Sequence, residues 1–226
     1  MRVTKQQTER MICYEDAEVI VVHKPPFLAV ETRDPRQQDL LTLLINRRTA
    51  RGEVAYIGVV HRLDQPVEGL LVLAKTREAA AFLSSRLRAG DFSKEYLAVV
   101  QGVTEESGTL VHTLKKDGKT NTSAVVPEGT VGGKEARLSY KRLAAADEKS
   151  LLRIRLDTGR HHQIRVQFAA LGHPLLGDEK YGAKPLNGQP LALCANHLSF
   201  VHPGSKKRMD FEIEPKNNLF ISTKEL

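Results

Sequence analysis

The chain has 226 residues, of which 41% are hydrophobic and 27% are charged, a balance typical of a globular protein with one good core. Its 34 Lys and Arg residues against 27 Asp and Glu residues give a net charge of +7, which favours a polyanionic partner such as nucleic acid. No apolar stretch approaches the roughly 18 residues of a membrane span, and the N-terminus lacks the apolar core of a signal peptide, so we expect a cytoplasmic protein without a membrane partner.

The cysteine and aromatic residues narrow the possible classes of protein further. The two cysteines, Cys13 and Cys194, lie far apart and lack the spacing of metal ligands, so we expect reduced thiols and no metal site. The chain has no Trp and only 5% aromatic residues, which argues against an extended stacking platform for single-stranded nucleic acid.

The first half of the chain predicts strands with two helices between them. Residues 18–24 predict a strand that ends at Pro25-Pro26. Residues 39–46 predict a helix with three leucines on one face and arginines 47, 48 and 51 at its C-terminal end. Thr76 is expected to cap a second helix that ends at Gly90.

Between these helices, residues 61–71 (HRLDQPVEGLL) place one carboxylate, Asp64, in a short loop between two apolar runs. Pro66 disfavours helical backbone at Gln65, which predicts a strand–loop–strand element. A carboxylate on a loop between buried strands is well placed to act as a nucleophile. The residues alone also allow an Asp that caps its own loop.

The second half of the chain continues the mixture of strands and a helix. Residues 96–100 and 209–213 predict strands, and residues 152–156 predict a half-buried strand whose outer face carries Arg153 and Arg155. Residues 161–171 predict a helix, and the Gly-rich, polar residues 115–134 predict a long mobile loop or a hairpin. Strands in clusters with inserted helices favour an α+β fold with a largely antiparallel or mixed sheet.

Three segments together carry a family resemblance: residues 61–71, residues 94–102 (KEYLAVVQG) and residues 158–166 (TGRHHQIRV). With them the chain resembles the RluA-type RNA pseudouridine synthases over about residues 14–214. The resemblance implies one α+β catalytic domain over residues 1–226, with a long mixed sheet, flanking helices and an active-site cleft. We expect no small N-terminal RNA-binding domain of the kind that many relatives carry, and we expect a monomer.

The implied reaction is the isomerisation of specific uridines in ribosomal or transfer RNA. It breaks the bond between base and sugar and rejoins the same base through carbon, so we expect no cofactor and no metal. The enzyme must supply a nucleophile or proton acceptor, a pocket for the detached uracil and exclusion of water. A base inside folded RNA must also be flipped out, which costs a few kcal/mol that contacts to phosphate offset.

Three residues match the family's catalytic positions. The resemblance implies that Asp64 is the catalytic carboxylate, that Tyr96 lies against the target base, and that Arg165 pairs with the carboxylate to keep it ionised and oriented. The alternatives without a catalytic role are a buried strand tyrosine at position 96 and an exposed helical arginine at position 165.

Five further residues are expected to contact the substrate. Arg62 is implied to bind RNA and to fill the space left by the flipped base, and Ile164 to touch the uracil face. Arg160 and His162 are expected to contact phosphate or backbone. For His61 a structural hydrogen bond is nearly as well supported as a substrate contact, and we do not expect a general base there. His161 and His162 are adjacent and so do not share a helix face, which argues against a metal site at this pair.

One part of the motif departs from the family. The common form has Thr-Ser-Gly where this chain has Val67-Glu68-Gly69. A carboxylate at Glu68 would repel a nearby phosphate, so we expect an effect on substrate register more than on chemistry. Lys24 matches a family lysine with an at least partly structural role, and residues 177–182 (GDEKYG) match a structural turn.

Two other functions stay open at this point. A non-catalytic RNA-binding protein could keep the fold, but it has no need of all three catalytic residues. A hydrolase of glycosidic bonds normally needs two carboxylates, and only Asp157 and Asp178 are weak candidates for the second. The cations expected to bind RNA, with about four to seven phosphate contacts, are Arg47, Arg48, Arg51, Lys115 to Lys119, Arg153, Arg155 and Arg160.

Overall fold

The structure is a computed structural model that describes residues 2–186 and 188–221. In this part of the chain the residues form two compact units. Unit 1 comprises Met1–Lys94 and Ala195–Glu214, and unit 2 comprises Glu95–Cys194 and Pro215–Leu226. Two long strands, β5 (Ser93–Gln101) and β10 (Leu193–Val201), contribute residues to both units. The expectation of one catalytic domain over residues 1–226 stays a prediction.

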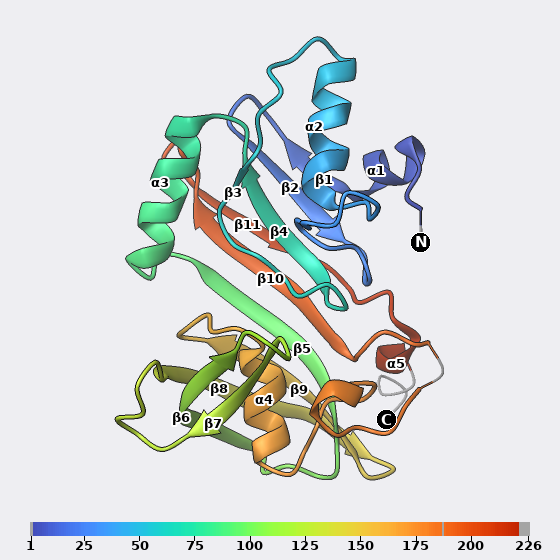
Figure 1. Cartoon of the computed structure of the whole chain (residues 1–226), viewed down its shortest axis with the longest axis vertical. Helices are drawn as coiled ribbons and strands as arrows, with labels where there is room; N and C mark the ends of the chain where they lie inside the picture. Colours follow the sequence, from blue (N-terminus) through green and yellow to red (C-terminus); the bar gives the residue numbers. More distant parts are fainter. Residues whose placement is uncertain (1, 187, 222–226) are drawn as a thin grey trace. The chain divides into compact units, whose positions relative to one another are not determined.

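Unit 1 is built from strands that lie side by side in the order β1, β2, β4, β10 (Figure 1). β11 pairs with β10 and β3 pairs with β4, both antiparallel. The elements of unit 1 are α1 (Lys5–Met11), β1 (Ile12–Glu15), β2 (Val19–Lys24), α2 (Leu40–Ala50), β3 (Gly58–Val59), β4 (Glu68–Ala74), α3 (Arg77–Arg88) and β11 (Arg208–Glu212), together with β10.

The two central strands of unit 1, β2 and β4, are buried along their whole length. One face of these strands packs on α3, in a core of Val19, Val21, Leu70, Val72, Leu83 and Phe200 with smaller neighbours. α1 contacts β1, β2 and α2. Because both faces of β2 and β4 are covered, their sequences are continuous apolar runs instead of alternating patterns.

Unit 2 contains an antiparallel sheet in the order β5, β9, β8, β6, β7. The ring of Tyr140 on β8 lies 5.3 Å from the ring of Phe168, which places α4 over one face of this sheet. The remaining elements of unit 2 are β6 (Ser107–Asp117), β7 (Thr122–Val126), β8 (Lys134–Ala146), β9 (Lys149–Leu156), α4 (Gln163–Ala170), the 3-10 helix η1 (Glu179–Tyr181) and α5 (Asn218–Ile221).

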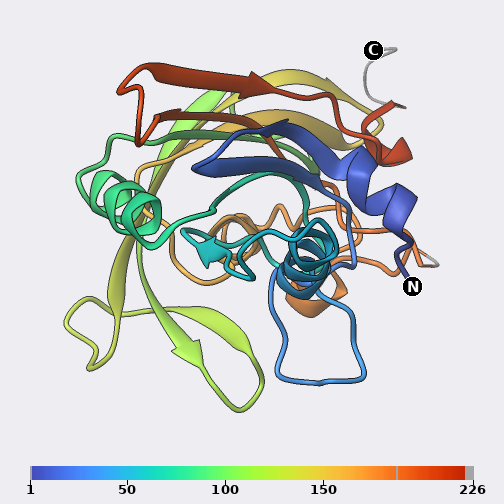
Figure 2. The ribbon, with the colours of Figure 1, turned by 90° about the horizontal axis from the view of Figure 1, so that it is seen from above.

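The predicted α+β fold with largely antiparallel strands and flanking helices is confirmed, and so are the individual strands and helices. Thr76 caps α3 by accepting a hydrogen bond from the Ala79 amide at 3.1 Å. α2 continues one turn past residue 46, and the first residue after this helix with a left-handed backbone is Gly52. Residues 115–134 contain a hairpin, in which β6 and β7 meet at Asp117 and Thr122; Figure 2 shows this hairpin in yellow-green.

Position 69, in the segment that follows Asp64, has room only for glycine. Its φ is +138°, and a Cβ placed there would lie 2.5 Å from the backbone nitrogen and oxygen of Ala195 on β10. A side chain would therefore force β4 away from β10. The physical reason for glycine at this position is the close approach of two backbones.

We expect Gly69→Ala to lower the free energy of unfolding by about 3 kcal/mol or more, because backbone atoms cannot give way as a flexible side chain can. The matched control is Gly52→Ala, where φ is +72° and no atom lies within 4 Å of the new Cβ. That control should cost about 1 kcal/mol from backbone strain alone. Urea unfolding of both variants measures the difference, and equal losses would contradict the role of close packing.

Candidate active site

The loop that carries Asp64 is fixed from both ends. Leu63 and Val67 flank the loop and are 7% and 2% exposed. The Val67 amide donates to the Asp64 carbonyl at 3.0 Å, which closes a turn around Pro66. The loop connects β3 and β4, which pair with each other, as the predicted strand–loop–strand element requires. Asp64 itself is half-buried, so a rigid frame presents its carboxylate.

A buried lysine fastens this loop to the end of β2. Lys24 is 0% exposed, and its ammonium donates to the carbonyls of Pro25 at 3.0 Å, Leu28 at 2.8 Å and Gln65 at 3.2 Å. These three bonds use all three donors of the ammonium group. Burial lowers the pKa of Lys24 to about 7, although the negative charge of Asp64 acts in the opposite direction. The at least partly structural role expected of Lys24 is to bind the Gln65 carbonyl and so to hold the Asp64 loop beside the end of β2.

The expectation that Glu68 would face a phosphate is not what the structure favours. Glu68 is 3% exposed, on a strand that is buried throughout. Its negative charge raises the pKa of Lys24, against the larger effect of burial. The carboxylate therefore compensates a buried ammonium inside unit 1 and does not add negative charge to the surface.

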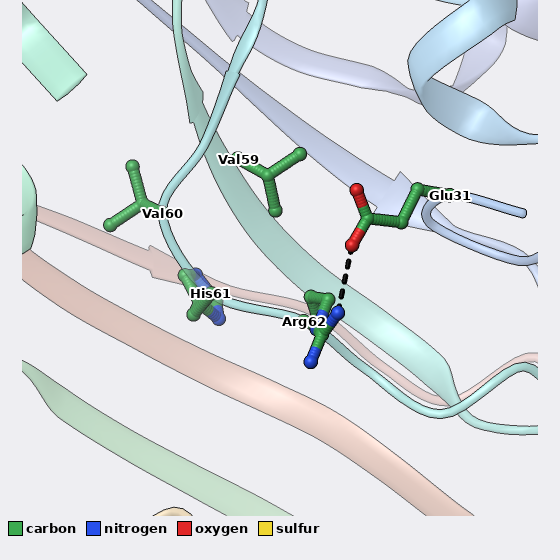
Figure 3. A pocket seen from close by; sticks show the side chains of 5 residues that line it. All are labelled: Glu31, Val59, Val60, His61 and Arg62. Atoms are coloured by element: carbon green, nitrogen blue, oxygen red, sulfur yellow. Dashed lines mark hydrogen bonds and ion pairs between the residues drawn. The ribbon is translucent and has the colours of Figure 1, made fainter.

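A pocket of about 290 Å³ lies beside the Asp64 loop and is lined by Glu31, Val59, Val60, His61 and Arg62 (Figure 3). Ligand pockets usually have volumes of about 300–1,000 Å³, so this one lies at the lower end of that range. Arg62 donates to Glu31 at 2.8 Å, and both side chains are exposed. Such exposed ion pairs contribute roughly 0–1 kcal/mol, so Arg62 can leave Glu31 at little cost.

His61 has a structural environment. Its Nε2 accepts a hydrogen bond from the Val72 amide at 3.3 Å, and its ring meets the edge of the Phe92 ring at 6.1 Å. Because Nε2 is an acceptor, we assign the ring proton to Nδ1. Burial, with a smaller effect of the charge on Lys94, lowers the pKa of His61 to about 3. The described contacts support the structural reading of His61, and a substrate contact stays a prediction.

In unit 2, three predicted site residues share one side of the sheet. Tyr96 on β5 and Tyr140 on β8 both lie opposite Ile154 on β9, so their side chains point to the same face. α4, which carries Ile164 and Arg165, covers this face through the Tyr140–Phe168 contact. Tyr96, Ile164 and Arg165 are 7%, 4% and 4% exposed, so all three are buried.

Arg165 binds a carboxylate that the sequence did not indicate as its partner. Asp178 accepts two hydrogen bonds from the guanidinium, both at 2.7 Å, and the pair is buried. The ring of Tyr181 lies 5.1 Å from the same guanidinium. Residues 177–182 were expected to form a structural turn, but they also supply these two contacts. The pairing of Arg165 with Asp64 stays a prediction. An acid and an aromatic ring in one turn segment gave a weak signal that the sequence alone could not direct to Arg165.

His162 is buried beside Tyr181. It is 7% exposed, has a left-handed backbone with φ of 53°, and its Nδ1 lies 2.7 Å from the Tyr181 hydroxyl. Burial, followed by the charge of Arg165, lowers the pKa of His162 to about 2. A contact of His162 with phosphate or backbone stays a prediction. Arg160 is exposed, and its Nε donates to the Glu135 carbonyl at 2.7 Å, so a phosphate contact by Arg160 stays a prediction.

The two weak candidates for a second carboxylate have other partners. Asp178 binds Arg165 through both oxygens, and Asp157 lies 3.3 Å from Arg137 at the surface. Among residues 2–186 and 188–221 no group of three His, Cys, Asp or Glu side chains could hold a metal. In the same residues, no helix is long and apolar enough to cross a membrane.

The environment of His61 predicts how stability depends on pH. Above pH 6.5 the ring is neutral in both the folded and the unfolded chain. From pH 6.5 down to about 3, only the unfolded chain binds a proton, so this contribution to stability is lost as the pH falls.

We therefore expect His61→Gln, whose amide oxygen can accept from the Val72 amide, to lose less stability than the wild type between pH 6.5 and 4. Urea unfolding across this range measures the slope, which should differ by up to about one bound proton. Parallel curves for the two proteins would show that the ring titrates normally in the folded state.

Known proteins with similar sequences identify the family of this chain. Residues 18–170 match the family model described as RNA pseudouridylate synthase. The ribosomal large subunit pseudouridine synthase D of Zymomonas mobilis is 33% identical over 95% of this chain and 72% of that protein. The Pseudomonas aeruginosa protein of the same name is 35% identical over 92% of this chain and 68% of its own length.

A solved structure shows the same fold. Human RNA pseudouridylate synthase domain containing 4 superposes with a TM-score of 0.78 at 20% identity, over 96% of this chain and 92% of that one. With the sequence matches, this likeness leads to one conclusion: the chain belongs to the RNA pseudouridylate synthase family, whose enzymes isomerise uridine in RNA to pseudouridine.

Proposed function

We propose that this enzyme isomerises uridines in the RNA of the large ribosomal subunit, with Asp64 as its catalytic carboxylate. The observation that carries the proposal is the rigid frame around Asp64, in which Leu63, Val67 and the Lys24 ammonium fix a half-buried carboxylate. The names of the Zymomonas and Pseudomonas relatives support ribosomal RNA over transfer RNA. We propose that it acts in the cytoplasm as a monomer, without metal or cofactor.

The proposed chemistry assigns a task to each residue. Asp64 adds to the substrate or accepts a proton after the uridine has flipped out of the RNA. Ile164 offers an apolar surface to the uracil, and Tyr96 lies against the base and assists removal of the proton at carbon 5. Burial of both side chains supports a site that excludes water while the base is detached.

We propose that Arg165 mainly orients the Asp64 carboxylate and contributes less to keeping it ionised. The guanidinium already binds Asp178, so the pair has no net charge and its long-range field is weak. Its remaining contribution is a set of fixed N–H donors. The two bonds to Asp178 and the Tyr181 ring restrain the guanidinium, which suits a hydrogen-bond donor that must hold a carboxylate in one direction.

The cations proposed to bind RNA are fewer than the sequence suggested. Arg47 contacts Glu9 and Glu15, Arg48 contacts Glu53, and both arginine side chains are buried. Arg153 and Arg155 alternate with Ile154 and so point away from the face of Tyr96. Arg62, Arg160, Lys116 and Lys180 are the exposed cations that we propose for phosphate contact.

The exchange of Asp64 for Asn tests the central claim. Asp64→Asn should release tritium from 5-tritiated large-subunit ribosomal RNA at below about 1% of the wild-type rate, while RNA affinity stays within about threefold. The reason is that the carboxylate acts on the flipped base and not on phosphates. Asp91→Asn, at an exposed pair with Arg86, is the control that should leave the rate unchanged.

The same assay separates the rival functions. Pseudouridine formation leaves the mass of the RNA unchanged, hydrolysis releases free uracil, and a binding protein does neither. Substantial turnover by Asp64→Asn would reject Asp64 as the catalyst, and free uracil from the wild type would favour a hydrolase.

The salt dependence of binding tests the proposed cations. The charges of Lys116 and Lys180 both lower the pKa of His162, which places them near α4 in unit 2. Lys116→Gln with Lys180→Gln should make the slope of log affinity against log salt shallower by about 1.4 to 1.8, the value for two lost phosphate contacts. Arg153→Gln with Arg155→Gln removes the same charge from the other face and should leave the slope unchanged. Equal effects of the two pairs would indicate unspecific attraction.

A further inference from the structure

Phe27 is an aromatic residue in a backbone conformation that normally belongs to glycine. It follows Pro26 in the turn after β2, and its φ is +65°. A turn with proline at its first central position and a positive φ at the second usually has Gly or Asn there. A side chain with a Cβ pays roughly 1–2 kcal/mol for this conformation. The fold alone therefore gives no reason to place a large ring at this position.

Burial does not repay this strain. Phe27 is 45% exposed, while its neighbours Leu28 and Val30 are 5% and 3% exposed and belong to the core. A strained residue whose side chain remains in solvent points to a function outside the fold, because strain of this kind concentrates at binding sites.

The position of Phe27 is fixed with respect to the Asp64 loop. Its carbonyl accepts a hydrogen bond from the Gln65 side-chain amide at 3.1 Å. The Lys24 ammonium binds carbonyls on both sides of Phe27, at Pro25 and Leu28, and also the Gln65 carbonyl. Four hydrogen bonds thus hold the turn and the loop as one assembly within unit 1. An exposed ring in such an assembly is preorganised for a contact close to the residue after the catalytic one.

We propose that the Phe27 ring is a stacking surface for an unpaired nucleobase of the RNA, close to the uridine on which Asp64 acts. The proposal rests on the proposed function. An RNA base that is splayed out of its helix offers a flat π-face, and aromatic side chains are the usual partners of such bases. A single ring is also consistent with the low aromatic content of the chain, which argues against an extended platform but not against one stacked base.

The test uses the strained backbone to separate binding from folding. Phe27→Gly removes the ring and relieves the strain, so the variant should be at least as stable as the wild type. Its affinity for a transcript of large-subunit ribosomal RNA should nevertheless fall about 5- to 100-fold, as expected for loss of one stacked base. Phe27→Leu, which is apolar but has no π-face, should lose a similar amount. Phe27→Trp and Phe27→Tyr should bind within about threefold of the wild type.

Two further measurements make the result specific. Binding is measured in the Asp64→Asn background, which excludes turnover, and tritium release is measured under single turnover at saturating RNA. The rate at saturation should stay within about threefold in Phe27→Gly, because the ring is proposed to bind a neighbouring base and not the reacting one. Val54→Ala, which truncates another exposed apolar side chain in unit 1, should change neither quantity.

The possible outcomes distinguish this proposal from the proposed function. Wild-type affinity in Phe27→Gly, or wild-type affinity in Phe27→Leu, would overturn the stacking role, and so would failure of Phe27→Trp to bind better than Phe27→Gly. If the wild type binds the transcript in a Phe27-dependent way but releases no tritium, the stacking role stands and the proposed ribosomal substrate or reaction fails.

Discussion

The Asp64 region depends on the hydrogen bonds that the buried ammonium group of Lys24 donates to three backbone carbonyls. An ammonium in an apolar interior is costly unless every donor is bonded and a negative charge is near. Here three backbone carbonyls bind the three donors, and the charges of Asp64 and Glu68 oppose the loss of the proton. Lys24 is the last residue of β2, and these carbonyls belong to the turn after it and to the Asp64 loop. One buried charge therefore joins three segments that the sequence separates by up to 41 residues.

The buried charge of Lys24 also explains the presence of a buried carboxylate at Glu68. On a buried strand, a second carboxylate near Lys24 compensates an ammonium that burial otherwise destabilises. The replacement of a small polar residue by Glu in the motif is thus a matter of internal charge balance. Arg62 and Phe27, which we propose to contact the RNA, are both exposed on unit 1.

Unit 2 handles its charges in a comparable way. The Arg165–Asp178 pair is buried and bidentate, and Tyr181 connects it to His162 and to the amide of Ser123 on β7. Both histidines with strongly lowered pKa values, His61 and His162, are neutral participants in such networks. Buried hydrogen bonds thus surround candidate site residues in both units, and contact of the exposed cations with phosphate stays a proposal.

The sequence by itself determined the elements and the candidate chemistry. Local signals were sufficient: β-branched runs before Pro25, the cap at Thr76, and a carboxylate in a Pro-containing loop between apolar segments. These features act over a few residues, so they can be identified without a partner far along the chain. The family motif around Asp64, Tyr96 and Arg165 identified the reaction class for the same reason.

Only the tertiary structure decided which charges are available. A cation in the sequence looks the same whether it is exposed or paired, so Arg47 and Arg48 were expected on an RNA surface although Glu9, far along the chain, binds Arg47 and the nearby Glu53 binds Arg48. The partner of Arg165 is 13 residues away, and the register of β5 and β9 set the face of Arg153. Burial turned Glu68 from a surface charge into an internal one. Such properties depend on contacts between distant segments, which no local pattern encodes.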